Sequence, residues 1–160
     1  MKSQADKSRG EQLQDEKAPA EKSQGEIEAA VCDGISRFQQ EFIGRGPRDI
    51  HAHVVGTLVL VQLQGVLTAA ERQLLAPRTD GDGDGDAMAA GHDNGNGRAL
   101  LKQVRSHMVA IGRPRLREIV EVATGVPLVS VHHDISTVTG EEVLVFSLSE
   151  PPACRRRRKP

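Results

Sequence analysis

The sequence predicts an α+β fold: two helix–hairpin halves, in the order α-β-β-α-α-β-β, that form a four-stranded antiparallel sheet with helices on one face. Three observations predict this class. Apolar residues recur at helical spacing from Ile27 to Phe42 and again from Leu101 to Ala123. Two runs of alternating apolar and polar residues, joined by a glycine-containing turn, follow each helical half. The chain has 160 residues, which is enough for one domain.

Three segments differ in composition from this pattern. Residues 1–25 carry equal numbers of acidic and basic residues and little aliphatic surface, so burial there cannot offset the entropy of ordering. Residues 77–96 alternate aspartate with glycine, and residues 151–160 include five consecutive basic side chains. We therefore expect a disordered leader at 1–25, one folded domain over 26–150 with a flexible acidic loop at 77–96, and a disordered basic tail at 151–160.

The first predicted helix has clear start and stop signals. Ser23 and Glu26 have the spacing of a capping box, in which each side chain bonds to the backbone of the other. Gly44 and the following Gly46-Pro47 end the helix. Its apolar face comprises Ile27, Val31, Ile35, Phe38 and Phe42.

The first predicted hairpin turns at Gly56-Thr57, a pair that suits a two-residue turn. In that register Val55 faces Leu58, and one aliphatic set points to the core. This set comprises Ile50, Ala52, Val54, Val59, Val61 and Leu63. A second capping box, Thr68 to Glu71, then begins a short helix that ends near Ala76.

The second half repeats the order of helix and hairpin. Its predicted helical face comprises Leu101, Val104, Met108 and Ile111, continued by Leu116, Ile119, Val120 and Ala123. Pro114 removes a helical hydrogen bond, so we expect a kink or two abutting helices. Residues 128–137 and 141–149 indicate the second hairpin. The sheet face that carries Leu58, Leu60, Val143 and Val145 is too apolar to stay exposed, which predicts a homodimer.

Three sequence runs resemble the MpsC family, a bacterial family formerly described as a domain of unknown function. They are residues 44–47 (GRGP), 63–71 (LQGVLTAAE) and 132–141 (HHDISTVTGE), and the resemblance covers residues 26–150. The matching positions are Gly44, Gly46, Pro47, Gly65, Thr68, Glu71, His132, His133, Asp134, Thr137, Thr139, Gly140 and Glu141.

The resemblance implies an accessory or regulatory role without enzymatic activity. The family is named for a sodium-linked membrane-potential-generating system, whose other components are linked to cation-dependent uptake of inorganic carbon. The MpsC-type component itself has no established chemistry. The chain is therefore expected to contact a membrane-transport partner from the cytoplasmic side, and to need no cofactor.

Composition limits the other functional classes. Aromatic residues make up 2% of the chain, and Trp and Tyr are absent, which argues against specific nucleic-acid binding through stacked bases. No apolar run is long enough to span a bilayer, so we expect a chain that does not span the membrane. Cys32 and Cys154 are too few and too far apart for a disulfide framework, which favours a reducing, cytoplasmic setting.

Four side chains form a candidate metal or ligand site. His51 and His53 lie two residues apart on one strand, and His132 and Asp134 repeat this spacing in the second hairpin. Alternate strand residues point the same way, so each pair shares a face. If the hairpins bring the pairs together, three imidazoles and a carboxylate suit zinc or another divalent ion. The alternatives are hydrogen-bonding residues on a half-exposed or dimer-facing sheet, or a pH-sensing role.

A basic helical segment is the candidate surface for a partner or an anion. From Arg98 to Arg117 the chain has six basic residues and no acidic one. Arg98, Lys102 and Arg105 have the spacing of one helical stripe, predicted to lie opposite the apolar face. Together with Arg113, this stripe could bind an acidic partner, a phosphate or an anionic surface. The alternative is a solvated helix face.

Three further features carry less chemistry. Residues 80–86 begin like a calcium-binding loop, but the position that requires a bidentate glutamate is Gly91. Ser136, Thr137 and Thr139 lie near His132 in sequence, but strand neighbours do not form a catalytic hydrogen-bond chain and no nucleophile elbow occurs. Cys32 lies beside the apolar helix face and is interpreted as a packed thiol. The sequence therefore predicts no catalytic residue.

Overall fold

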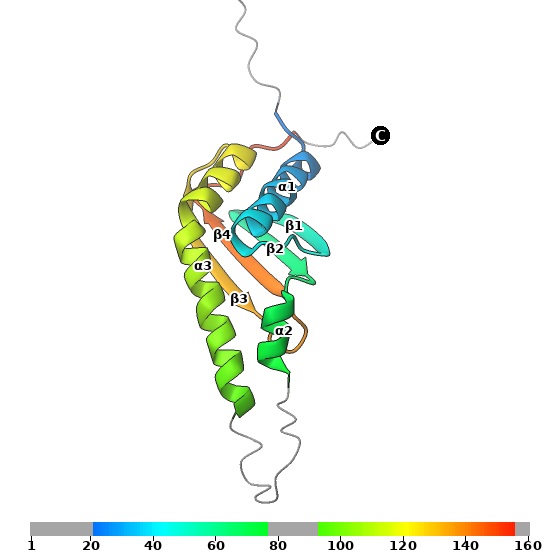
Figure 1. The fold of residues 1–160 in the computed structure, drawn as a ribbon. Coiled ribbons are helices and arrows are strands. Elements are labelled where there is room, and N and C mark those ends of the chain that lie inside the picture. The colour runs from blue at the N-terminus through cyan, green and yellow to red at the C-terminus, as the bar shows by residue number, and fades with distance from the viewer. Residues whose placement is uncertain (1–20, 77–92, 156–160) are drawn as a thin grey trace, which may run out of the picture.

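The computed structural model describes residues 21–76 and 93–155 and confirms the predicted α+β class and order of elements. Predictions for residues 1–20, 77–92 and 156–160, including the calcium-like run, lie outside the described residues. The elements are α1 (Gln24–Ile43), β1 (Asp49–Val55), β2 (Leu58–Gln64), α2 (Ala69–Leu75), α3 (Asp93–Thr124), β3 (Leu128–Ile135) and β4 (Glu142–Leu148) (Figure 1).

The four strands form one antiparallel sheet in the order β1-β2-β4-β3. The register of the first hairpin is the predicted one, with Val55 opposite Leu58 and Ala52 opposite Val61. The pairing of β2 with β4 joins the two hairpins, and the sequence alone does not predict it. As a result β1 and β3, the first strand of each half, are the two edges of the sheet.

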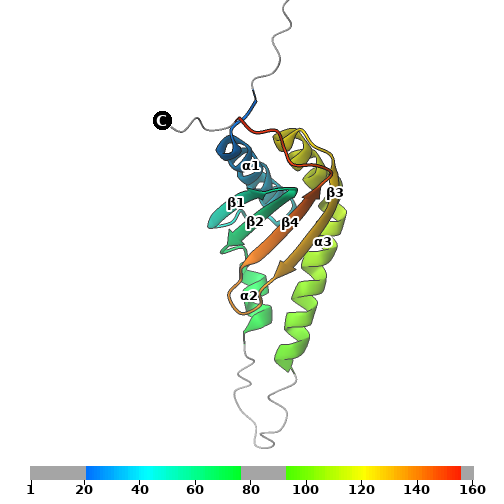
Figure 2. The same cartoon turned by 180° about the vertical axis from the view of Figure 1, so that it is seen from behind.

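The helices cover one face of the sheet, and no described helix covers the other (Figures 1 and 2). We call this second face the open sheet face; its central side chains are Leu58, Leu60, Val143 and Val145. Between the sheet and the helices lies the core. Its buried side chains include Val31, Ile35, Phe38, Val59, Val61, Leu63, Leu116, Val120, Ile135, Leu144, Phe146 and Leu148.

Both predicted capping boxes are present. The Ser23 hydroxyl accepts from the Glu26 N–H, and the Glu26 carboxylate accepts from the Ser23 N–H. Thr68 and Glu71 make the same pair of bonds at the start of α2. Gly44, at a φ of 81°, caps the C-terminus of α1. Local signals therefore fix three helix ends.

Element boundaries differ from the predictions at three points. Because Ser23 is the N-cap, α1 already includes the last two residues of the predicted leader. The amphipathic helix α3 continues N-terminally to Asp93, inside the predicted acidic loop. In the predicted tail, Pro152 is buried and the Arg155 N–H donates to the Lys22 carbonyl, so this segment packs against the chain before α1.

Helix α3 is continuous through Pro114, so the prediction of two abutting helices is wrong. Its axis bends in both views, near the change from green to yellow in the colour scale (Figures 1 and 2). The predicted apolar face is also rotated: Val104 is 44% exposed and Ile111 is 60% exposed. The buried line follows Leu101, Arg105, Val109, Leu116, Ile119, Val120 and Ala123. Within the described ranges, no helix combines the length and apolar character needed to cross a membrane.

Candidate functional site

The two predicted histidine pairs lie on opposite edges of the sheet. His51 and His53 are on β1, whereas His132 and Asp134 are on β3, and both pairs point to the open sheet face. Two strands, β2 and β4, separate them. With about 4.8 Å between neighbouring strands, the pairs are about 14 Å apart. The chain therefore does not assemble the predicted four-residue site on its own.

Each of these side chains has a local partner. His51 Nε2 lies 3.0 Å from Asp49 Oδ2, and His132 Nε2 lies 3.2 Å from the Ser130 hydroxyl. Lys102 Nζ donates to both oxygens of Asp134, at 2.7 and 3.0 Å. This bond holds the pKa of the Asp134 carboxyl below its usual range. The described part of the chain contains no group of three or more His, Cys, Asp or Glu residues placed to hold a metal ion.

The predicted basic stripe is wrong at Arg105. Its side chain has 0% of its surface exposed, and it lies on the sheet side of α3 rather than opposite it. The helix is oriented so that the residues facing the core recur every four positions, at Leu101, Arg105 and Val109. Arg98, Lys102 and Arg113 are exposed, as predicted.

Arg105 is the centre of a buried polar network that sequence reasoning missed. Its Nε and Nη2 donate to the two oxygens of Glu71, both at 2.7 Å, which is a bidentate pair. Nη2 also donates to the Val66 carbonyl at 2.9 Å. A charge buried this fully requires such partners, because leaving it unpaired costs several kcal/mol.

The network continues through Glu142 at the start of β4. Glu142 Oε2 lies 3.4 Å from Arg105 Nη1 and accepts from Gln39 Nε2 at 2.8 Å. Glu142 Oε1 lies 2.7 Å from His133 Nε2. The side chain of Glu142 is fully buried and that of His133 is 5% exposed. Four elements, α1, α2, α3 and the β3–β4 hairpin, thus meet through charged or polar groups.

The electrostatics of Glu71 show which interaction dominates. Partial burial alone would raise the pKa of its carboxyl, but the hydrogen bonds from Arg105 and from the Thr68 N–H outweigh burial and lower the pKa. The residue therefore stays ionised and pairs with Arg105 while it also caps α2. Two buried polar atoms, Gln39 Oε1 and His133 Nδ1, have no hydrogen-bond partner among the described residues.

Most of the motif residues have structural roles in this geometry. Thr68 and Glu71 cap α2 and bind Arg105, and His133 contacts Glu142. The β3–β4 turn is closed by Gly140 N–H donating to the Ser136 carbonyl and by Glu141 N–H donating to the Thr139 hydroxyl.

Cys32 is half-buried, and burial raises the pKa of its thiol, as expected for a packed cysteine.

Comparisons with known proteins match this chain to a protein family and to an uncharacterized bacterial protein. The model of the family "Na+-translocating membrane potential-generating system (MpsC)" matches residues 23–90 and 91–150. The chain is 30% identical to the uncharacterized protein YbcI of Bacillus subtilis (strain 168) over 127 aligned residues. The aligned region covers 79% of this chain and 89% of YbcI. No solved structure matches the chain.

Proposed function

This chain belongs to the MpsC family, and from that membership we propose that it is a non-enzymatic accessory or regulatory protein of a cation-linked membrane-potential-generating system. The match of the family model over residues 23–150 is the observation that carries the proposal. In this proposal the system serves inorganic-carbon uptake. The protein acts on the membrane component of that system from the cytoplasmic side.

The exposed basic face of α3 is the proposed contact surface. Arg98, Lys102 and Arg113 project within about 60° of one another on the helix. All three are exposed, and Lys102 is already paired with Asp134. Such a face attracts an acidic segment of a partner and loses affinity as salt rises. Arg105 is not part of this surface, because it is buried.

The test is binding to the membrane component of such a system in detergent, measured with purified proteins. We expect salt-sensitive binding that survives a chelator, and about tenfold weaker binding for the double variant Arg98→Glu, Arg113→Glu. Arg37→Glu, an exposed arginine on α1, is the matched control. An absence of wild-type binding would reject the accessory role, and equal binding by the double variant would reject this surface.

We further propose that the chain is a homodimer through the open sheet face. Leu58 and Leu60 are 41% and 38% exposed there, and Val143 and Val145 lie between them and β3. A contiguous apolar centre of this kind, on a sheet with no described helix over it, is typical of an interface. A second copy of the same face is self-complementary in its apolar centre.

A metal- or ligand-binding sensor is the second candidate, and the sheet register favours it. His53 lies in the same row as His132, and His51 in the same row as Asp134. If two open faces pack about an axis parallel to the strands, β1 lies over β3 of the second copy. His53 then meets His132 of the partner subunit, so the predicted ligands come together between copies.

One purified sample tests both the homodimer and the metal-binding sensor. Light scattering with refractive-index detection gives the mass, because a chain without Trp or Tyr barely absorbs at 280 nm. Elemental analysis of the same tag-free protein gives the metal content. A metal-free dimer supports the homodimer and rejects a metal sensor. Stoichiometric metal that is lost in His53→Ala and in His132→Ala would instead place the sensor first, and a monomer would reject both.

A further inference from the structure

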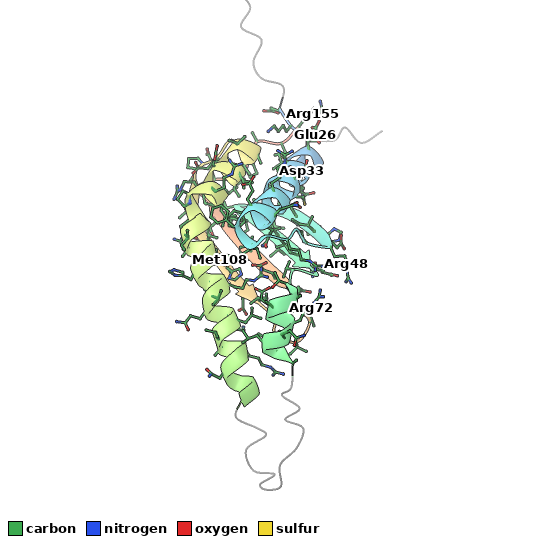
Figure 3. The ribbon with its side chains drawn as sticks, in the orientation of Figure 1. Glu26, Asp33, Arg48, Arg72, Met108 and Arg155 are labelled. Atoms are coloured by element: carbon green, nitrogen blue, oxygen red, sulfur yellow. The ribbon has the colours of Figure 1, made fainter. Side chains whose placement is uncertain are left out.

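A pocket of about 320 Å³ lies at the end of the sheet where β2 passes into α2. Three segments far apart in sequence line it: Arg48 before β1, four residues between the end of β2 and the middle of α2 (Gln64, Gly65, Leu67 and Arg72), and Thr139–Glu141 in the β3–β4 turn. Figure 3 shows Arg48 and Arg72 at this end of the molecule. The volume is within the range of pockets that bind small molecules. None of these residues is part of the surfaces proposed above.

Two glycines allow the pocket walls to close. Gly65 has a φ of +67°, and a Cβ there would lie 2.6 Å from Arg48 Cβ. Gly140 has a φ of +70°, and a Cβ there would lie 2.9 Å from Leu67 Cδ1. Both positions therefore require glycine for backbone conformation and for space. The Arg48 N–H also donates to the Gln64 carbonyl at 2.8 Å, which fixes the residue beside Gly65.

The described residues that line the pocket carry a net positive charge. Its lining includes two arginines, Arg48 and Arg72, and neither makes an ion pair with another described residue. Against them stands one carboxylate, Glu141, whose Oε2 accepts from Gln62 Nε2 at 3.1 Å. Two cations and one anion leave one positive charge without compensation from the pocket lining.

The buried network fixes the position of Arg72. Its neighbour Glu71 is bound by both Arg105 nitrogens from α3 and by the Thr68 N–H. Helix α2 is therefore tied to the core one residue away from the pocket arginine. A donor on an anchored element binds at a lower cost in ordering than one on a free loop.

We propose that this pocket binds a small organic or inorganic anion through a carboxylate or phosphate group. Arg48 and Arg72 donate to the anionic oxygens, since guanidinium groups match both carboxylate and phosphate in geometry. Thr139 and Glu141 also line the pocket, and their side-chain oxygens can accept from a hydroxyl or amino group of the same ligand. The proposal does not depend on the accessory role or on the dimer.

The experiment is an NMR titration of the full chain labelled with ¹⁵N, because a chain without Trp or Tyr has little intrinsic fluorescence. One arm uses inorganic phosphate and the other uses lactate, a hydroxy-carboxylate, both against chloride at equal ionic strength. We expect the assigned amides of Gly65 and Gly140 to shift and saturate in the millimolar range, as suits so small a ligand. The arm that binds more tightly identifies the anionic group.

Variants locate the binding site. Arg48→Gln and Arg72→Gln should each weaken binding about tenfold, because each removes a charge-assisted hydrogen bond. Both side chains are exposed, so these variants should keep the wild-type spectrum elsewhere. Arg37→Gln, outside the pocket, should bind like wild type. Shifts that do not saturate, shifts that centre on α3 instead, or wild-type affinity in both pocket variants would each overturn the proposal.

Discussion

The buried layer between sheet and helices has two parts that are built differently. Over most of its length it is mainly aliphatic, with side chains such as Val31, Val61 and Leu144. At the end near α2 it is polar, with Arg105 between Glu71 and Glu142 and with His133 and Gln39 beside them. Apolar contacts are not directional, so the aliphatic part tolerates small shifts of its elements. The polar part requires all its partners at once.

This difference concerns helix α2 most of all. No residue within α2 is buried, so apolar packing attaches it weakly. The bidentate bond from Arg105 to Glu71 connects it to α3, and the Val66 carbonyl connects Arg105 to the chain before α2. We infer that the polar part of the core fixes where α2 lies, and with it one wall of the pocket at Arg72.

The largest expected effect comes from breaking the polar part at Arg105. Arg105→Leu leaves Glu142 buried without its cation and Glu71 without its bidentate donor, so we expect a loss of about 3–5 kcal/mol in the free energy of unfolding. Leu144→Ala, in the aliphatic part, should lose about 2–5 kcal/mol through a cavity. Urea unfolding followed by far-ultraviolet circular dichroism measures both.

Hydrogen exchange separates the two variants even where their stabilities are equal. In Arg105→Leu the amides of α2 should lose protection before those of β2 and β4, because the helix has lost its main attachment. Leu144→Ala should weaken protection across the sheet. The order in which the amides of α2 and of the strands lose protection should stay as in the wild type. Arg113→Leu, an exposed position on the same helix, should change stability by less than about 0.5 kcal/mol. Equal exchange patterns in the two core variants would contradict the division of the core.

A smaller effect, and one that depends on pH, is expected for Glu71→Gln. Glutamine also suits the last position of a capping box, so this change mainly removes the charged pair with Arg105. At neutral pH the loss should be about 1.5–3 kcal/mol, the usual value for a hydrogen bond to a charged group. The folded-state pKa of Glu71 is lowered, so its contribution is present above the unfolded pKa and is lost as pH falls through the folded value.

Unfolding measured between neutral and acid pH checks the sign of this effect. The wild type should be more stable than Glu71→Gln at neutral pH, and the gap should close from about pH 4.5 downward, as the carboxyl becomes protonated. Glu26→Gln, at the other capping box, lacks a buried cation and should show a smaller gap. A gap that stays constant with pH would mean that Glu71 acts through its shape alone.

The sequence predicts the local elements of the fold well, for a physical reason. The first hairpin, with its turn at Gly56-Thr57, and the two capping boxes depend on residues close together in sequence, and their patterns are direct. The pairing of β2 with β4 depends on contacts some 80 residues apart, and no local pattern encodes it. For that reason the separation of the two histidine pairs could not be predicted from spacing.

The polar part of the core could not be predicted because periodicity treats charge as a sign of exposure. On α3 this rule places Arg105 outside and Val104 inside, and the structure has the reverse. One signal was available: Arg105 follows the buried Leu101 by one helical turn and precedes Val109 by another. The capping residue Glu71 was recognised for its local role, but its partner lies 34 residues away, where no sequence pattern connects the two.

The smallest expected effect tests the same contrast on the surface. The bond from Lys102 to Asp134 is as short as the two bonds from Arg105 to Glu71, 2.7 Å, but both of its side chains are exposed. Water and salt screen such a pair, so Lys102→Ala should cost at most about 1 kcal/mol, and less at high salt. Urea unfolding at low and high ionic strength measures it. A loss comparable to that of Arg105→Leu would mean that bond length, and not burial, determines how strongly the Lys102–Asp134 and Arg105–Glu71 pairs stabilise the fold.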